Sequence, residues 1–310
     1  MTNVLFAGTD ENWETYKALI PEALKARGVT AVFSRDFAPE TVDYIVYSPL
    51  GPVQDFTPFT RLKAVLSLWA GVERIVGNKT LKAPLCRMVD NGLKKGMAEW
   101  VAGHCLRYHL GMDAHIVNPK HEWRSGMAPP LAEDRTIGIL GLGELGQACA
   151  TALNCLGFKV TGWSRSLKDI EGIVCFAGAD GLNALLARSE ILVLLLPQTA
   201  DTTHVLNIES LAKMPKGACI LNPGRGPLID DDALIAALNA GHISHATLDV
   251  FAKEPLPQGH AYWTHPNVTV TPHIASETRP KSAAQVVAEN VKRGEDRTPL
   301  LFQVDSRLGY

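Results

Sequence analysis

The sequence predicts an α/β protein in which one parallel-sheet domain is inserted into another. Three observations predict it. Apolar runs of strand length alternate with helical patterns, a glycine-rich turn follows such a run only near the middle of the chain, and a short amphipathic stretch follows the last run. With 310 residues, of which 46% are hydrophobic, the chain can bury two cores.

Residues 1–98 predict the first part of a small parallel-sheet domain. Strands are expected at 3–7, 31–33, 44–47, 64–68 and 85–89, with a long helix over 12–27. A helical pattern from 94 to about 117 crosses to the next domain. Asn118-Pro119 and the stretch 123–130 then predict an extended loop.

Residues 99–273 predict a dinucleotide-binding domain. Six strands are expected, each a nearly continuous apolar run as in a sheet covered on both faces, at 136–140, 158–163, 191–196, 218–221, 246–251 and 268–271. The first is followed by Gly141-Leu142-Gly143-Glu144-Leu145-Gly146 and a helical pattern over 147–156. In such a Rossmann turn Gly141 bends the chain, Gly143 admits a pyrophosphate and Gly146 lets the helix approach the strand. We therefore expect cofactor phosphates at Gly141, Gly143, Glu144, Leu145 and Gly146, at the helix N-terminus.

The end of the second strand favours NADP(H) over NAD(H). Ser164-Arg165-Ser166 stands where NAD-binding proteins place an acidic residue on the adenosine ribose, and it holds no carboxylate. A guanidinium offers a charged fork to a 2′-phosphate, which an aspartate would repel. NAD(H) is the second candidate, and the competing interpretation is that Arg165 is a solvated residue at a strand end.

Polar segments follow the last three strands. They are Asn222-Pro223-Gly224-Arg225-Gly226, 249–257 and Thr271-Pro272-His273-Ile274-Ala275-Ser276. Because ligands gather at the carboxyl ends of parallel strands, Arg225, Glu254 and His273 are expected to converge near the cofactor. Taken singly, each has a plainer interpretation, as a surface arginine, a solvated glutamate or a histidine that only fills space.

These motifs, with Leu196-Pro197-Gln198-Thr199-Ala200-Asp201-Thr202-Thr203, resemble the D-isomer-specific 2-hydroxyacid dehydrogenase family. Within it, the chain is most similar to the glyoxylate/hydroxypyruvate reductase A group, along its whole length. The resemblance implies a Rossmann domain inserted into a smaller flavodoxin-like parallel α/β domain, which residues 274–310 complete.

The resemblance also implies site residues. Arg225 would bind the substrate carboxylate and carbonyl, Glu254 would support the histidine, and His273 would donate the proton. Substrate binding would involve the loop Trp69-Ala70-Gly71-Val72, which is followed by Glu73 where many members carry Asp. Further cofactor-binding positions are implied at Leu196, Pro197, Thr202, Pro223, Gly224, Arg225, Asp249, His273, Ala275 and Ser276.

The function implied is NADPH-preferring reduction of small 2-keto acids, such as glyoxylate and hydroxypyruvate, to 2-hydroxy acids by hydride transfer. Two alternatives stay open. One is another D-2-hydroxyacid dehydrogenase, of the D-lactate or phenylpyruvate type. The other is a nucleotide-sensing, corepressor-like binding protein, for which the short ends of the chain leave little room for partner-binding tails.

Composition limits the classes of binding partner and the cellular compartment that we expect. A net charge of −2 gives no field for nucleic acid, and no apolar run approaches the roughly 18 residues of a membrane span. Six cysteines without a C-x-x-C pair argue against a metal site or disulfides and indicate the cytoplasm. The resemblance implies a homodimer through 94–117 and 123–130, with Trp100, Tyr108 and Trp123 as contacts unless they pack within one subunit.

Overall fold

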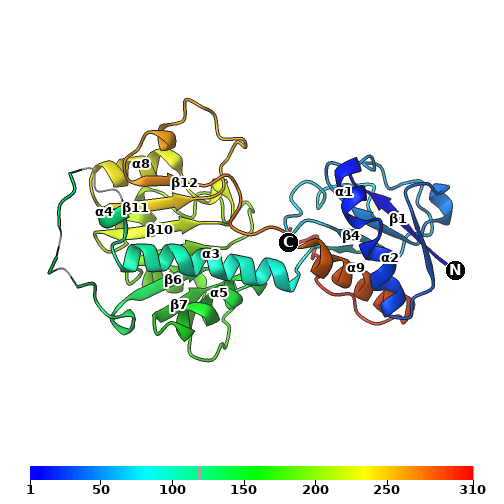
Figure 1. Cartoon of the computed structure of the whole chain (residues 1–310), viewed down its shortest axis with the longest axis horizontal. Helices are drawn as coiled ribbons and strands as arrows, with labels where there is room; N and C mark the ends of the chain where they lie inside the picture. Colours follow the sequence, from blue (N-terminus) through cyan, green and yellow to red (C-terminus); the bar gives the residue numbers. More distant parts are fainter. Residues whose placement is uncertain (117–119, 124, 127, 310) are drawn as a thin grey trace. The chain divides into compact units, whose positions relative to one another are not determined.

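The computed structural model describes residues 1–116, 120–123, 125–126 and 128–309. The chain forms two compact units, one made of Met1–Leu93 with the chain from Glu277 onward, the other of Lys94–Ser276. Each has its own parallel sheet, so the predicted fold class, with one domain inserted into another, is confirmed (Figure 1). The domain boundaries expected from the sequence, after residues 98 and 273, stay predictions.

The first unit holds a five-stranded sheet in the order β2-β1-β3-β4-β5, with every pair parallel. This is the strand order of flavodoxin-like folds. The strands are β1 (Thr2–Ala7), β2 (Ala31–Ser34), β3 (Tyr44–Tyr47), β4 (Ala64–Ser67) and β5 (Leu85–Cys86). All five lie where the apolar runs predict them, because buried parallel strands need apolar residues on both faces.

The single helix expected over 12–27 is wrong. The structure has two helices there, α1 (Asp10–Tyr16) and α2 (Leu19–Ala26). Pro21 explains the break, since proline lacks an N–H and its ring collides with the carbonyl of the preceding turn, so that it fits only in the first turn of a helix. Thr9 begins α1 by accepting a hydrogen bond from the Asn12 amide at 3.2 Å.

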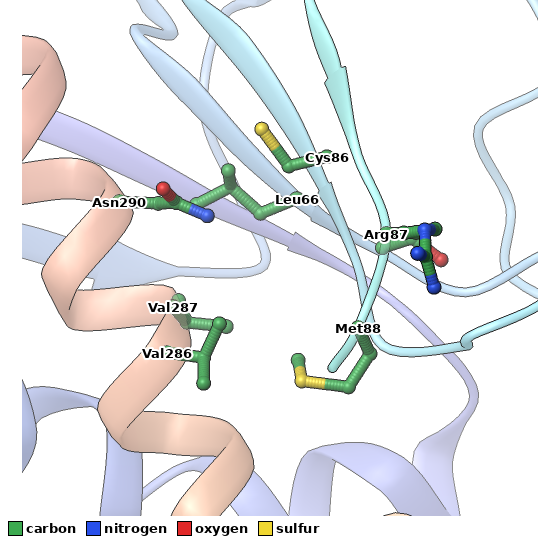
Figure 2. A pocket seen from close by; sticks show the side chains of 8 residues that line it. Leu66, Cys86, Arg87, Met88, Val286, Val287 and Asn290 are labelled. Carbon is green, nitrogen blue, oxygen red and sulfur yellow. The ribbon is translucent and has the colours of Figure 1, made fainter. Parts of the chain in front are cut away.

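The returning C-terminal segment packs on the first unit. Helix α9 (Pro280–Glu295) lies beside α2 and buries Val287 and Val291 in the same cluster as Ile20 (Figure 1). A pocket with no room for a water molecule lies between α9 and the strands, with Cys86 and Val287 among its lining (Figure 2). After α9, the Val304 amide bonds to the Leu85 carbonyl at 2.8 Å, so the tail covers the β5 edge.

The second unit holds a seven-stranded parallel sheet in the order β12-β11-β10-β9-β6-β7-β8. The strands are β6 (Thr136–Leu140), β7 (Lys159–Trp163), β8 (Val174–Phe176), β9 (Ile191–Leu194), β10 (Ala218–Asn222), β11 (Ile243–Leu248) and β12 (Val268–Val270). The expected count of six is wrong because β8 has only three residues and lies at the sheet edge with Val174 exposed. The strand order reverses between β6 and β9, which is where ligands bind in doubly wound sheets.

Helices cover both faces of this sheet. On one face, α3 (Asn91–His109) and α5 (Glu144–Cys155) bury Val101, Cys105 and Cys149 against β6. The other face is covered by α6 (Gly178–Leu186), α7 (Ile208–Ala212) and α8 (Asp231–Asn239). Short 3₁₀ turns lie at Pro39–Thr41, Ala132–Asp134, Gly226–Leu228 and Ala261–Trp263.

The helix expected from 94 to about 117 begins earlier and ends sooner. The Asp90 carboxylate accepts from the amides of Gly92 and Leu93, at 2.7 and 3.1 Å, and caps the start of α3. Gly111, at φ +61°, separates α3 from the short helix α4 (Asp113–Ile116). Val117, Asn118 and Pro119 lie outside the described residues, as do 124 and 127 of the expected loop; the described residues of 123–130 form neither helix nor strand.

No helix in the described part of the chain is both long and apolar enough to cross a membrane.

Candidate active site

The glycine turn after β6 combines close packing with open space. Gly141 has φ +107°, and a Cβ there would lie 2.5 Å from the Leu195 carbonyl oxygen. A Cβ on Gly146 would overlap the carbonyl oxygen of Gly141, so only glycine lets α5 begin this close to the strand. A Cβ on Gly143 would meet no atom of the described residues within 4 Å. The turn is thus tight at both ends and open at its centre, with the first amides of α5 beside the opening.

The turn after β7 carries hydroxyl and guanidinium groups. The Ser164 hydroxyl donates to the Ser166 carbonyl at 2.7 Å, and the Ser164 amide donates to the Phe176 carbonyl of β8 at 3.1 Å. Arg165 and Ser166 are exposed. The strand that the sequence analysis missed therefore supports the residues expected to select the cofactor.

The turn after β9 is closed by one threonine. The Thr202 hydroxyl donates to the Pro197 carbonyl at 2.7 Å and accepts from the Thr199 amide at 2.8 Å. Leu196 is buried ahead of this turn, and Pro197 is half-buried. Thr202 therefore shapes the segment beside the sheet's point of reversal, next to the glycine turn.

The turn after β10 places Arg225. The buried Asn222 side chain accepts from the Gly224 amide at 3.1 Å and donates to the Arg225 carbonyl at 2.9 Å. Pro223 and Gly224 are buried, and Arg225 is half-buried with its guanidinium donating to the Gly224 carbonyl at 2.7 Å. A Cβ on Gly226 would overlap the Phe251 backbone, so this glycine brings the Arg225 turn against the segment that leads to Glu254.

Glu254 and His273 form a hydrogen-bonded pair. His273 Nδ1 lies 2.8 Å from Glu254 Oε2, and the Phe251 amide donates to Glu254 Oε1 at 2.9 Å. The histidine side chain is 52% exposed, and Nδ1 is the ring nitrogen that contacts Glu254. The carboxylate is therefore held from one side by backbone and orients the imidazole on the other.

The buried Asp249 carboxylate, at the end of β11, holds the loop that carries His273. Its Oδ1 accepts from the Thr271 hydroxyl at 2.6 Å and from the Ile274 amide at 2.9 Å, and its Oδ2 accepts from the Ala275 amide at 2.8 Å. The backbone carbonyl of Asp249 accepts from the His273 amide at 2.8 Å. These bonds support His273 in a left-handed backbone conformation, φ +56°, that a residue with a side chain rarely adopts.

The expected substrate loop lies in the first unit. The hydroxyl of Ser67, the last residue of β4, accepts from the Trp69 amide at 3.0 Å and donates to the Trp69 carbonyl at 3.1 Å. The Trp69 ring is 37% exposed with the Arg74 guanidinium 5.7 Å from its centroid, so it does not fill the core of that unit. Ala70 and Gly71 are half-buried, and Val72 is buried.

The structure thus brings together Glu254 and His273, and sets the Arg225 turn against their segment. The roles of these residues, and the place of Asp249, Ala275 and Ser276 in a cofactor site, stay predictions. Two positioning residues were missed by sequence reasoning, Asn222 and Thr271. Each opens a motif that the sequence analysis singled out, yet nothing in the motif tells which polar residue points inward. Among the described residues, no group of three His, Cys, Asp or Glu could hold a metal.

A family model described as "D-isomer specific 2-hydroxyacid dehydrogenase, NAD binding domain" matches residues 104–275. The chain is also similar to the glyoxylate/hydroxypyruvate reductase A of Serratia proteamaculans (strain 568). The two are 38% identical over 99% of this chain and 100% of the relative.

Two solved structures show the same architecture. A D-isomer specific 2-hydroxyacid dehydrogenase from Xanthobacter autotrophicus Py2, in complex with NADPH and MES, superposes with a TM-score of 0.91 at 38% identity, covering 100% of this chain and 99% of that one. An NADPH-dependent glyoxylate/hydroxypyruvate reductase from Sinorhizobium meliloti, in complex with NADP and sulfate, superposes with a TM-score of 0.84 at 34% identity, covering 100% of both chains.

Proposed function

We propose that this chain, which belongs to the D-isomer specific 2-hydroxyacid dehydrogenase family, reduces small 2-keto acids such as glyoxylate and hydroxypyruvate with NADPH. The observation that carries the chemistry is the 2.8 Å contact between His273 Nδ1 and Glu254 Oε2. It leaves the second ring nitrogen to exchange a proton with a substrate oxygen. The relatives named above support the substrate class.

The glycine turn fits a dinucleotide. The space over Gly143 and the amides at the start of α5 suit a pyrophosphate, because helix N-terminal N–H groups and the helix dipole favour anions. When bound, the nicotinamide cofactor supplies the hydride that reduces the C2 carbonyl. Thr202 and Pro197 would border the cofactor beside the point of strand reversal.

Ser164, Arg165 and Ser166 support the preference for NADPH. Arg165 would bind the 2′-phosphate with its guanidinium, and the two serines would add hydroxyl and amide donors. The presence of NADPH or NADP in the two similar solved structures agrees with this assignment.

His273 would donate the proton. The Glu254 carboxylate fixes the imidazole by accepting from Nδ1–H, so the proton delivered to the carbonyl oxygen would leave from Nε2. Arg225 would hold the substrate carboxylate and face the carbonyl oxygen, where negative charge develops in the transition state. The loop Trp69-Ala70-Gly71-Val72 would bind the same carboxylate through backbone amides.

One assay series tests this function. Glyoxylate, hydroxypyruvate, pyruvate and phenylpyruvate are offered to the purified chain with NADPH and with NADH, and oxidation of the cofactor is followed. We expect glyoxylate and hydroxypyruvate to give the highest kcat/KM, with NADPH ahead of NADH by at least about tenfold. A higher kcat/KM for pyruvate or phenylpyruvate would favour another 2-hydroxyacid dehydrogenase. Cofactor binding without turnover would favour the binding-protein alternative.

We further propose a cytoplasmic homodimer. All six cysteines are free, which suits a reducing compartment. Exposed apolar side chains gather along 110–131, including Leu110, Ile116 and Trp123, the last 95% exposed. Tyr108, in contrast, lies within the unit, where its hydroxyl meets that of Thr247 at 2.5 Å. Sedimentation equilibrium should give twice the 33.6 kDa chain mass, and Trp123→Ser should shift the mass towards the monomer; an unchanged dimer would place the interface elsewhere.

A further inference from the structure

Glu144 is the first residue of α5 and stands within the glycine motif, directly after Gly143. A negative side chain there is favourable for the free helix, whose N-terminus carries partial positive charge. It is unfavourable for the proposed ligand, because the turn would then present a carboxylate beside a pyrophosphate. Like charges repel strongly where water is partly excluded. The turn therefore needs a compensating cation before it can bind a dinucleotide well.

Lys94, on α3, meets this carboxylate. Its ammonium donates to Glu144 Oε2 in an ion pair between residues 50 positions apart in the sequence. The two side chains are 28% and 39% exposed, so the pair is neither fully solvated nor buried. Helix α3 thereby brings a positive charge to the rim of the phosphate-binding turn, whereas the next residue, Lys95, is exposed.

We propose that Lys94 balances the charge of the cofactor site: by pairing with Glu144, it lets the glycine turn accept the pyrophosphate of a dinucleotide. This inference rests on the proposed function. The pair makes the side-chain charge beside Gly143 neutral, so the amides of α5 and the open space over Gly143 face the phosphates without opposition. Because the pyrophosphate is common to both cofactors, Lys94 serves affinity and leaves the choice between NADPH and NADH to the turn after β7.

A purely structural ion pair between α3 and α5 would behave differently. Its loss would lower stability by the small amount typical of partly exposed pairs and would leave phosphate affinity unchanged. The test therefore measures cofactor binding directly, by fluorescence titration with NADPH and with NADH. It uses the full-length chain and the variants Lys94→Gln, Glu144→Gln, the double variant and Lys95→Gln as the matched control.

Lys94→Gln should raise the Kd of both cofactors roughly five- to tenfold at low salt, because it leaves Glu144 unpaired beside the phosphates. The difference should shrink at high salt. Glu144→Gln should lower Kd about threefold, and the double variant should return to within about twofold of wild type. Lys95→Gln should stay within about twofold.

Unchanged Kd in Lys94→Gln, no recovery in the double variant, or an equal effect of Lys95→Gln would overturn the inference. So would a loss confined to NADPH, since Lys94 would then act on the 2′-phosphate. If Lys94→Gln does not fold, Glu144→Gln still tests the inference through its lower Kd. Lys94→Arg keeps the positive charge and should bind both cofactors like wild type. A wild-type chain that binds neither cofactor overturns the proposed function as well, whereas normal wild-type binding with insensitive variants overturns this inference alone.

Discussion

Two loops of the second unit carry residues of the candidate active site, and their shapes are fixed in opposite ways. The turn after β6 takes its shape from absent side chains, because Gly141 and Gly146 let the backbone approach where a Cβ would collide. The loop after β12 takes its shape from one side chain, the buried Asp249 carboxylate, which accepts from the Thr271 hydroxyl and from the amides of Ile274 and Ala275. Both follow the carboxyl ends of parallel strands.

The difference shows that the residues that determine the shape of a loop can lie within its own motif or far from it in the sequence. The glycine turn depends on residues within one short motif. The His273 loop depends on an aspartate 22 to 26 residues earlier, and without it the left-handed backbone of His273 would lack support. Breaking the first loop should therefore need one methyl group, and breaking the second should need the loss of one charge.

Gly146→Ala should have the largest effect. Its methyl group would overlap the backbone oxygen of Gly141, which no rotamer change can relieve, so α5 must move away from β6. We expect the free energy of unfolding to fall by about 3–5 kcal/mol and NADPH affinity to fall at least about 100-fold. Urea unfolding and fluorescence titration measure the two quantities.

Gly143→Ala is the matched control within the same turn. A methyl group there meets no atom of the described residues within 4 Å, so the free energy of unfolding should change by less than about 0.5 kcal/mol. NADPH affinity should still fall, because the methyl group takes the space in which a phosphate approaches. Equal stability losses in the two variants would refute the distinction between packing and ligand space.

Asp249→Asn should come next. The amide retains one acceptor oxygen but cannot accept from three donors as the carboxylate does, and it adds a donor in a buried place. We expect a loss of about 2–3 kcal/mol in the free energy of unfolding and a fall in kcat of up to about 100-fold, because His273 loses its position. Steady-state kinetics and urea unfolding measure both.

Thr271→Val serves as the graded control, since it removes one of the three donors and should lower kcat only a few-fold. His273→Asn should give the lowest kcat of these variants, because it removes the proposed proton donor, while NADPH binding should be kept. An Asp249→Asn enzyme with wild-type kcat would show that the loop keeps its shape without the charge.

The same contrast explains what the sequence could predict. The two parallel sheets and the glycine turn follow from apolar runs and glycine spacing, which are local signals, and both the fold class and the family are confirmed. Strand β8 lies within the apolar run Ile173-Val174-Cys175-Phe176-Ala177, so its signal was present in the sequence, but the strand itself has only three residues and lies at the sheet edge. The break at Pro21 was readable in the sequence, since an interior proline should have ended the helix.

The same contrast between local and long-range signals applies to the residues of the candidate site. Arg225, Glu254 and His273 stand in motifs and could be named in advance. The bonds of Asp249 and the inward-facing role of Thr271 depend on which strands are neighbours, since β12 flanks β11. The bonds of the Asn222 side chain stay within its own turn, and the motif alone does not tell that this side chain points inward. The Lys94–Glu144 pair joins residues 50 positions apart in different helices, and no sequence spacing predicts such a contact.

The stability of the native chain should also depend on pH, on the β11–β12 side of the sheet. Burial, and then the Arg107 guanidinium, lowers the pKa of His245 from 6.5 to about 4, with Asp113 opposing and His265 and His104 adding to the shift. Because the folded-state pKa lies below the unfolded one, the folded chain binds fewer protons in between. The stabilisation is complete above pH 6.5 and is lost as the pH falls towards 4. Burial also lowers the pKa of His104, which acts in the same direction.

We expect the free energy of unfolding to fall by on the order of 2 kcal/mol across this window, as measured by urea unfolding at several pH values. His245→Gln, whose amide can still meet the Thr269 hydroxyl that His245 Nε2 contacts at 3.0 Å, should flatten the slope. Hydrogen exchange should show protection lost earlier along β11 and β12, which lead into the Asp249 and His273 segments, than along β6. An unchanged slope in His245→Gln would mean that other groups take up the protons. Equal loss of protection along β11, β12 and β6 would mean that the loop held by Asp249 is no more sensitive to acid than the glycine turn.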